Sequence, residues 1–415
     1  MFVQSIIPVS FLLVLLVSCC DVLNTNYDPH FDEEGHLIKD TLTEKKFRPV
    51  RPHKIKFYVE VSGSMNGFFR ANAPTKFKED VWRIISYYAP TTDNVTILTN
   101  DGTAGANVPI ASFQNQMNTG AFVSSASTKV PLMIKSIINS FNPDEGEVAV
   151  LISDMKYSPV GSAAPNVLLT QYSTDISRIF GEYGKAISLV GAKSQYLDIS
   201  GNTVCQESPY YYLIIGNQEH VAYLRNGIST LIDNNGNLID NIESGFNYGV
   251  PSYSFGISDN CFQKDSEPTF WGYDPSYSDT CMIRLRIDLE NYRWAIIRKD
   301  VFPHAFQCKA IYGSEIIVDK IQYFEQNITE KKLERKAYAD VDLKIYNMAT
   351  DSEVIEWTLQ LPDLDIIKFT PFLGAIEEGD VSKSYSLEDF IKGMFYGGVV
   401  NNELKPNYIL ISKTS

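Results

Sequence analysis

Acidic and hydroxyl side chains follow two apolar segments in the first half of the chain. Glu60 lies at the end of one segment, Ser62 and Ser64 come directly after it, and Asp154 lies just past the other. A carboxylate beside a buried strand needs a hydrogen bond, an ion pair or a metal ion, because an uncompensated charge is costly away from water. In open α/β sheets, ligands bind outside the carboxyl ends of the strands. We therefore expect these four side chains to face a common ligand.

The segments that must position these residues alternate between strand and helix patterns. Apolar residues fall on one face of a helix at residues 77–88, 130–141, 168–183 and 221–231. Continuous apolar runs, typical of strands buried on both faces, occur at Phe57–Val61, Val95–Leu98, Val148–Ile152, Ile187–Val190 and Tyr210–Ile215. Because helices must cover both faces of such a sheet, residues 51–235 are predicted to form an α/β domain with a doubly wound, mainly parallel sheet.

The segment Phe57–Met65 carries a family resemblance. Its sequence, Phe-Tyr-Val-Glu-Val-Ser-Gly-Ser-Met, resembles the first strand and metal loop of von Willebrand factor A-type domains. That family writes the loop as Asp-x-Ser-x-Ser, and the two serine hydroxyls ligate a divalent ion at the site called MIDAS. The resemblance implies this role for Ser62 and Ser64. Glu60 occupies the position of the family's leading aspartate, which acts through water or a serine hydroxyl.

Two further positions resemble the family pattern, which covers residues 54–193. Ser125 stands where the family has a threonine in a loop before a helix, with Ser127 and Thr128 as alternatives. Asp154 is similar to the acidic residue after the family's fourth strand. The resemblance thus implies a metal site made of Glu60, Ser62, Ser64, Ser125 and Asp154.

The chemistry of this set favours a hard cation. Hydroxyls and carboxylates are oxygen donors that suit Mg²⁺, with Ca²⁺ or Mn²⁺ as alternatives. Two acidic groups leave at least one position for water or for an incoming carboxylate. In the family, an acidic side chain of a protein partner fills that position. The resemblance therefore implies a binding module with a protein ligand.

Catalysis is not expected. Of the five histidines, His30, His36 and His53 lie in or beside an N-terminal segment without regular periodicity, which leaves little for a catalytic triad. Ser64 lacks the glycine two places before it that a nucleophile elbow requires. A hydrolase stays as an alternative, as does a metal-free structural or assembly module.

The second half of the chain, residues 236–415, has a different period. Apolar and polar residues alternate at residues 283–289, 339–345 and 355–361, as in half-buried strands. A turn through residues 347–352 is expected to join the last two as a hairpin. Ser386 and Asp389 form a capping-box pattern before a late helix. These features predict a β-rich, sandwich-like second domain.

The N-terminus predicts export. Residues 1–18 contain no charged side chain and are mostly apolar, as in a signal peptide. The segment Leu16-Val17-Ser18-Cys19 resembles the lipobox of bacterial lipoproteins, which implies a lipid on Cys19 and a tether over residues 19–50. We therefore expect a lipoprotein of the cell envelope, at the outer membrane or cell surface, with the periplasm as an alternative. An ordinary signal peptide and a free protein form the competing interpretation.

The remaining composition limits the partners. The net charge of −14, without a Lys/Arg stripe, argues against nucleic acid as a partner. Cys205, Cys261, Cys281 and Cys308 form an even set whose pairing the sequence does not define.

Aromatic and Asp/Asn-rich segments offer two other kinds of site. Trp271, Tyr273 and Tyr277 lie in an irregular stretch that could present aromatic faces to a glycan, which is a second hypothesis for this chain. The segments 198–202 and 233–237 are interpreted as turns, although the second has the look of a calcium loop.

Overall fold

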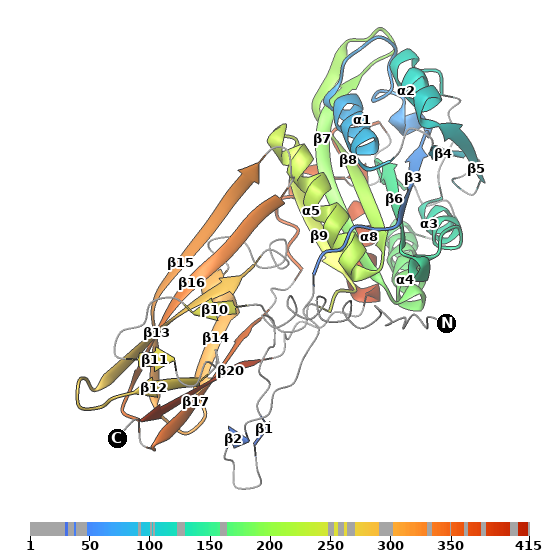
Figure 1. Cartoon of the computed structure of the whole chain (residues 1–415). Coiled ribbons are helices and arrows are strands. Elements are labelled where there is room, and N and C mark those ends of the chain that lie inside the picture. The colour runs from blue at the N-terminus through green and yellow to red at the C-terminus, as the bar shows by residue number, and fades with distance from the viewer. Residues whose placement is uncertain are drawn as a thin grey trace, which may run out of the picture.

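A seven-stranded sheet forms the centre of the first half of the chain (Figure 1). The structure is a computed structural model, and it describes residues 30–31, 37–38, 48–89, 93–99, 102, 104–122, 129–157, 164–247, 253–255, 261–263, 270–289, 302–329, 334–348, 350–360, 364–374, 379–398 and 406–413. The strands of this sheet lie in the order β5-β4-β3-β6-β8-β7-β9. They are β3 (Lys54–Glu60), β4 (Asn94–Thr99), β5 (Ala104–Pro109), β6 (Glu147–Ser153), β7 (Ala186–Leu197), β8 (Thr203–Gly216) and β9 (Leu238–Ser244).

The sheet is mixed, so the prediction of a mainly parallel sheet is wrong. Only β3–β4 and β3–β6 pair in parallel, whereas β4–β5, β6–β8, β7–β8 and β7–β9 pair antiparallel. The reason is the tight turn at residues 198–202, where Asp198 accepts hydrogen bonds from the backbone N–H groups of Ser200 and Asn202. This turn, which was expected, makes β7 and β8 a hairpin, and the hairpin places β8 between β6 and β7. All five strands expected in this half are present.

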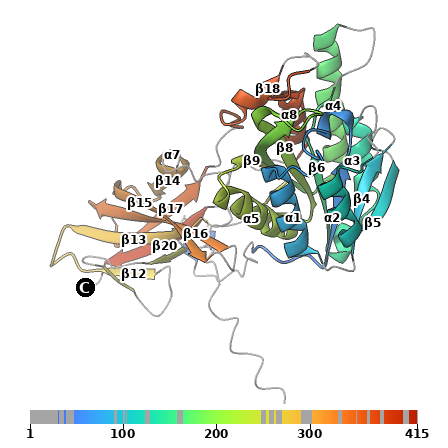
Figure 2. The same cartoon turned by 90° about the horizontal axis from the view of Figure 1, so that it is seen from above.

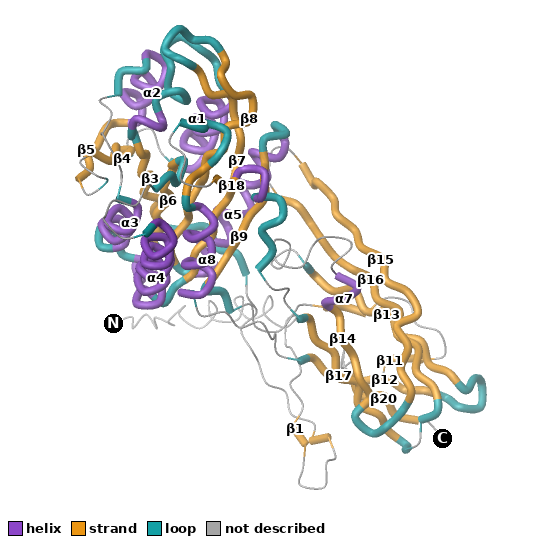
Figure 3. Tube along the Cα trace, turned by 180° about the vertical axis from the view of Figure 1, so that it is seen from behind, coloured by secondary structure: helices purple, strands orange, loops and turns teal. Residues whose placement is uncertain are grey.

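Helices cover both faces of the sheet and form two cores. On one face lie α1 (Lys76–Tyr88), α2 (Ile110–Thr119) and α5 (Gln218–Asn234). On the other face lie α3 (Val130–Ile138), α4 (Pro165–Tyr183) and α8 (Leu387–Gly397), which Figure 3 shows from behind. Alternate strand residues serve the two cores, since Phe57 and Val59 belong to the first and Tyr58 to the second.

Two elements from beyond residue 235 belong to these layers. β9 is the edge strand of the sheet beside β7, and α8 packs against α4. The helix predicted after Ser386 is therefore present, but the predicted capping box is wrong. Ser386 adopts a left-handed conformation with φ of 60°, and its hydroxyl makes no cap hydrogen bond.

The rest of the second half forms two larger β-sheets (Figure 2), and most of their buried apolar residues belong to the same continuous cluster as the core under α1, α2 and α5. A four-stranded sheet has the order β10-β13-β16-β15 and a five-stranded sheet the order β11-β12-β20-β17-β14. Their strands are β10 (Tyr253–Phe255), β11 (Cys261–Gln263), β12 (Phe270–Tyr273), β13 (Thr280–Asp288), β14 (Phe306–Ala310), β15 (Glu315–Thr329), β16 (Glu334–Tyr346), β17 (Ser352–Leu359) and β20 (Asn407–Lys413). Pairing is antiparallel except between β12 and β20. The short elements are β1 (His30–Phe31), β2 (Leu37–Ile38), β18 (Leu373–Gly374), β19 (Ser384–Tyr385) and α7 (Phe302–Ala305).

The expected hairpin between β16 and β17 is wrong. β16 pairs with β13 and β15, whereas β17 pairs with β14 and β20 in the other sheet. The turn that begins at Asn347, with φ of 51°, therefore leads the chain from one sheet to the other. The alternating pattern of the two strands was recognised, but such a pattern does not define which strand is the neighbour.

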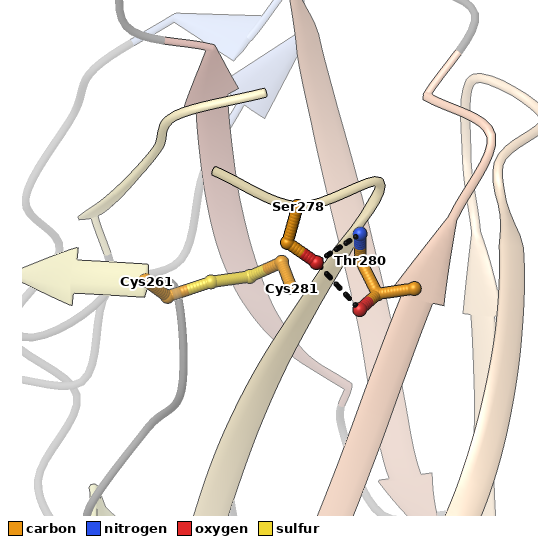
Figure 4. Close-up of a disulfide and its surroundings, with 4 residues drawn as sticks. All are labelled: Cys261, Ser278, Thr280 and Cys281. Atoms are coloured by element: carbon orange, nitrogen blue, oxygen red, sulfur yellow. Dashed lines mark hydrogen bonds between the residues drawn. A yellow bond between two sulfur atoms is a disulfide. The ribbon is translucent and has the colours of Figure 1, made fainter. Parts of the chain in front are cut away.

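A disulfide joins the two sheets of the second half. Cys261 in β11 is bonded to Cys281 in β13, with 5.7 Å between their Cα atoms, and Figure 4 shows the bridge beside the start of β13. There the Ser278 hydroxyl accepts a hydrogen bond from the Thr280 backbone N–H at 3.1 Å. Cys205 and Cys308 are free thiols. Export to an oxidising compartment would allow this bond to form.

The end of α5 and the turn after it, at residues 233–237, complete a buried polar network. Asp80 on α1 accepts hydrogen bonds from the Tyr210 hydroxyl at 2.9 Å and from the side-chain amides of Asn235 and Asn237 at 2.5 and 2.8 Å. Asp80 is 2% exposed. This network links α1, β8 and the end of α5, so the asparagines act on a carboxylate of the same domain.

The lipid and tether predictions concern the N-terminus. Residues 1–29, with Cys19, lie outside the described residues. Within the part that the structure describes, no helix is both long enough and apolar enough to cross a membrane.

Candidate functional site

The carboxyl ends of β3 and β6 meet at one edge of the sheet. These strands are parallel neighbours with Val59 opposite Ile152, so Glu60 lies beside Ser153, and Asp154 is the next residue. The helix after β3, α1, covers one face, and the helix after β6, α4, covers the other. Across the sheet, β3 to β6 lie in the order β5-β4-β3-β6, so the first four strands, counted along the chain, have the order 3-2-1-4. This is the order of doubly wound sheets, in which ligands bind where the connections diverge. Glu60 and Asp154 therefore flank this point.

Glu60 is held across the strand pair. It is 2% exposed, and the Ser153 hydroxyl donates a hydrogen bond to its Oε2 atom. The Ser153 Oγ atom also accepts a hydrogen bond from the Met155 backbone N–H at 2.8 Å. The sequence analysis did not single out Ser153, although it precedes Asp154 directly. This serine compensates part of the cost of burying the Glu60 carboxylate.

Ser62 and Ser64 form a pair of adjacent hydroxyls. Their Oγ atoms are 2.9 Å apart and share a hydrogen bond. Ser62 precedes the short 3-10 helix Gly63–Met65 with extended backbone, but its side chain makes no cap hydrogen bond. Met65 and Phe68, both nearly fully buried, anchor the loop to the core. The two hydroxyls are thus turned toward each other, as two ligands of one ion would be.

Asp154 is fully buried and only partly hydrogen-bonded. Its Oδ1 atom accepts a hydrogen bond from the Lys156 backbone N–H at 3.2 Å. Its Oδ2 atom has no hydrogen-bond partner among the described residues. A buried carboxylate oxygen of this kind costs free energy unless a cation or a water molecule meets it.

Tyr196 packs on the loop that carries Ser62 and Ser64. Its ring packs so closely on Gly67 that an added Cβ there would lie 2.3 Å from the ring, and the Leu197 N–H donates to the Gly67 carbonyl at 3.2 Å. Burial raises the pKa of the Tyr196 phenol, and the charge of Asp154 adds to that rise. Asp154 therefore acts on a side chain that also touches the loop of Ser62 and Ser64.

A segment from the second half covers this edge of the sheet. The Ser384 hydroxyl donates to the Asp154 backbone carbonyl at 2.8 Å, and the Ser386 hydroxyl donates to the Tyr157 carbonyl at 2.8 Å. Burial raises the pKa of the Tyr211 phenol, and Asp154 contributes to the shift. Nothing local in the sequence predicted the contact of this segment with the strand edge, since it lies more than two hundred residues after Asp154.

The structure therefore places four of the five predicted site residues, and the fifth lies outside the described residues. The structure brings Glu60 and Asp154 to one edge and joins Ser62 to Ser64. Ser125, with its alternatives Ser127 and Thr128, lies outside the described residues. Within the described part of the chain, no group of three or more His, Cys, Asp or Glu residues could hold a metal ion. A cation at this edge would depend on serine hydroxyls as well as on acids.

Comparisons with protein-family models, with curated proteins and with solved structures found no match to this chain.

Proposed function

We propose that the chain is an exported lipoprotein whose first domain is von Willebrand A-like and binds a protein partner through a divalent cation. The ion would be held by Ser62, Ser64 and Asp154. Glu60 would act on the ion through a serine hydroxyl, and Ser125 would be a further ligand from the loop before α3. The main support for this proposal is that the Oδ2 atom of Asp154 is buried and has no hydrogen-bond partner among the described residues. It lies at the edge where ligands of such sheets bind.

The residues present fit a hard cation. Asp154 offers a free oxygen, and the two serine hydroxyls are adjacent at 2.9 Å. Mg²⁺ is favoured, because it accepts few protein ligands and keeps positions for water, whereas Ca²⁺ takes more oxygens. When bound, the cation would supply an open coordination position for a carboxylate of the partner. The protein supplies the orientation of its oxygens and the burial that excludes competing water.

The second half would present or space this domain. We infer that its two sheets form a sandwich, since their apolar faces share one core and a disulfide links them. A lipid on Cys19 would attach the molecule to a membrane of the cell envelope.

Metal titration tests the proposal. Isothermal titration of the full chain with Mg²⁺, Mn²⁺ and Ca²⁺ is expected to reveal one site, weakened at least tenfold by Ser62→Ala and by Ser64→Ala. The control is Ser229→Ala, which removes a fully buried hydroxyl from α5 and should leave metal binding unchanged. Absence of binding by all three ions would favour a metal-free assembly module.

Peptide selection tests the partner chemistry. Displayed peptides selected in Mg²⁺ should lose binding in EDTA, and each should contain an essential Asp or Glu. Replacing that residue by Asn or Gln should abolish binding. Peptides that bind equally in EDTA would argue against a cation-bridged partner.

A further inference from the structure

A pocket of about 870 Å³ opens beside α1, α2 and the end of β7. Its volume lies within the roughly 300–1,000 Å³ that small-molecule sites occupy. None of the residues that line it belongs to the strand-end set of Glu60, Ser62, Ser64 and Asp154. The pocket is therefore a separate candidate site on the same domain.

Two apolar residues that line the pocket belong to the core or pack against it. Met117 of α2 is 1% exposed, and the half-buried Trp82 of α1 packs against the same core. Both side chains line the pocket. An aromatic ring held by the core offers a fixed flat surface to a ligand at little cost in conformational entropy.

The walls carry planar amides. Asn72, Gln114, Asn118 and Gln195 all line the pocket. Within the described part of the chain, the side-chain amides of Asn72, Gln114 and Asn118 make no hydrogen bond. Each amide has both a donor and an acceptor group, so one amide can pair with two neighbouring hydroxyls of a ligand.

The backbone donors that a phosphate would need beside the pocket are already in use. The first backbone N–H groups of α1 are already used, because Lys76 N donates to Gln195 Oε1 at 3.1 Å and Phe77 N to Ser194 Oγ at 2.8 Å. A phosphate at a helix N-terminus needs such groups to be free. Of the cations that line the pocket, Arg83 pairs with Glu79 at 2.9 Å, and the Lys78 ammonium donates to the Arg70 carbonyl.

We propose that this pocket binds a saccharide. A sugar ring has an apolar C–H face that fits Trp82 and a rim of hydroxyls that fits the amides of Gln114 and Asn118. This moves the glycan hypothesis away from the aromatic stretch of the second half, where Tyr277 is 83% exposed on a turn. Because the pocket does not use the strand-end residues, sugar binding does not require a divalent cation.

A glycan array probed with the full chain in EDTA tests the proposal, followed by titration calorimetry with the best oligosaccharide. Trp82→Ala is expected to reduce affinity at least tenfold. Asn118→Ala changes an exposed side chain on α2 and should reduce affinity several-fold without disturbing the core. Tyr87→Ala, on the same helix but outside the pocket, and Tyr277→Ala should leave binding unchanged.

The results separate this proposal from the cation site. An array without any bound oligosaccharide overturns it, as does unchanged affinity in a folded Trp82→Ala and in Asn118→Ala. Loss of binding in Tyr277→Ala alone would also overturn it. If sugar binding survives while metal binding is absent, the saccharide site stands and the cation proposal fails.

Discussion

Replacing Asp154 by asparagine should make the protein more stable than the wild type without Mg²⁺ and less stable than the wild type with Mg²⁺. Asp154 is fully buried, and its Oδ2 atom has no hydrogen-bond partner among the described residues. Without a cation, the neutral amide removes an uncompensated charge while keeping the shape of the side chain. An uncompensated buried charge costs several kcal/mol, whereas an unsatisfied neutral amide costs about 1–3 kcal/mol, so Asp154→Asn in EDTA should be about 1–2 kcal/mol more stable than the wild type.

With Mg²⁺ the order should reverse. A ligand at one hundred times its dissociation constant stabilises the native state by about 2.7 kcal/mol. For a domain of roughly 150–250 residues, 1 kcal/mol shifts Tm by about 2–4 °C, so the wild type should gain about 5–10 °C. Asp154→Asn should gain much less, because it loses an anionic ligand.

Thermal unfolding followed by circular dichroism, in EDTA and in a Mg²⁺ series, measures both effects. Asp240→Asn is the control, since it neutralises an 8% exposed aspartate on β9 at the edge of the sheet. It should respond to Mg²⁺ as the wild type does. Equal Mg²⁺ responses in the wild type and Asp154→Asn would refute the reasoning.

Three other predictions concern stability and location. Asp80→Ala leaves two buried donors, the Tyr210 hydroxyl and an asparagine amide, without their acceptor, which should cost about 2–4 kcal/mol in urea unfolding. The double variant with Tyr210→Phe should cost less than the sum of the singles, and strict additivity would contradict the network. Burial raises the pKa of Asp80 above its ordinary value of 3.8. The stability that this raised pKa contributes is therefore complete below pH 3.8 and decreases as the pH rises through the pKa of the native state. Asp80→Ala should lack this pH dependence. Replacing Cys261 and Cys281 by serine opens a loop with a sequence separation of 20 and should destabilise the second half by about 3 kcal/mol, measured by urea unfolding of the oxidised protein. Cys19→Ala should move the protein from the membrane fraction to the soluble exported fraction, and an unchanged distribution would contradict lipidation.

Local patterns predicted the elements well, because burial acts residue by residue. The run around Phe57 is apolar on both faces since helices cover both sides of β3. The two runs that precede Glu60 and Asp154 were recognised as buried strands, and the parallel pairing of β3 and β6 brings both residues to one edge. The strand β5 and helix α2 were missed, because Ala104–Pro109 has little apolar character for a strand.

Long-range pairing was not predictable from these patterns. The apolar run of β8 predicts a buried strand but not whether it is parallel or antiparallel to its neighbours. Only the pairing with β6 and β7 defines its orientation. From beyond residue 235, β9 joins the first sheet and α8 packs against α4, and the Ser384 hydroxyl donates to the Asp154 carbonyl. In each of these contacts, the sequence of one segment does not indicate which other segment it pairs with or packs against.

Diffraction from crystals soaked in Mn²⁺ tests the central claim most directly, since the ion scatters anomalously and takes the same oxygen ligands as Mg²⁺. We predict an anomalous peak at about 2.0–2.3 Å from the hydroxyls of Ser62 and Ser64, on the side of Asp154. A strand edge without any peak, at Mn²⁺ concentrations that occupy other hard-cation sites, would contradict the claim.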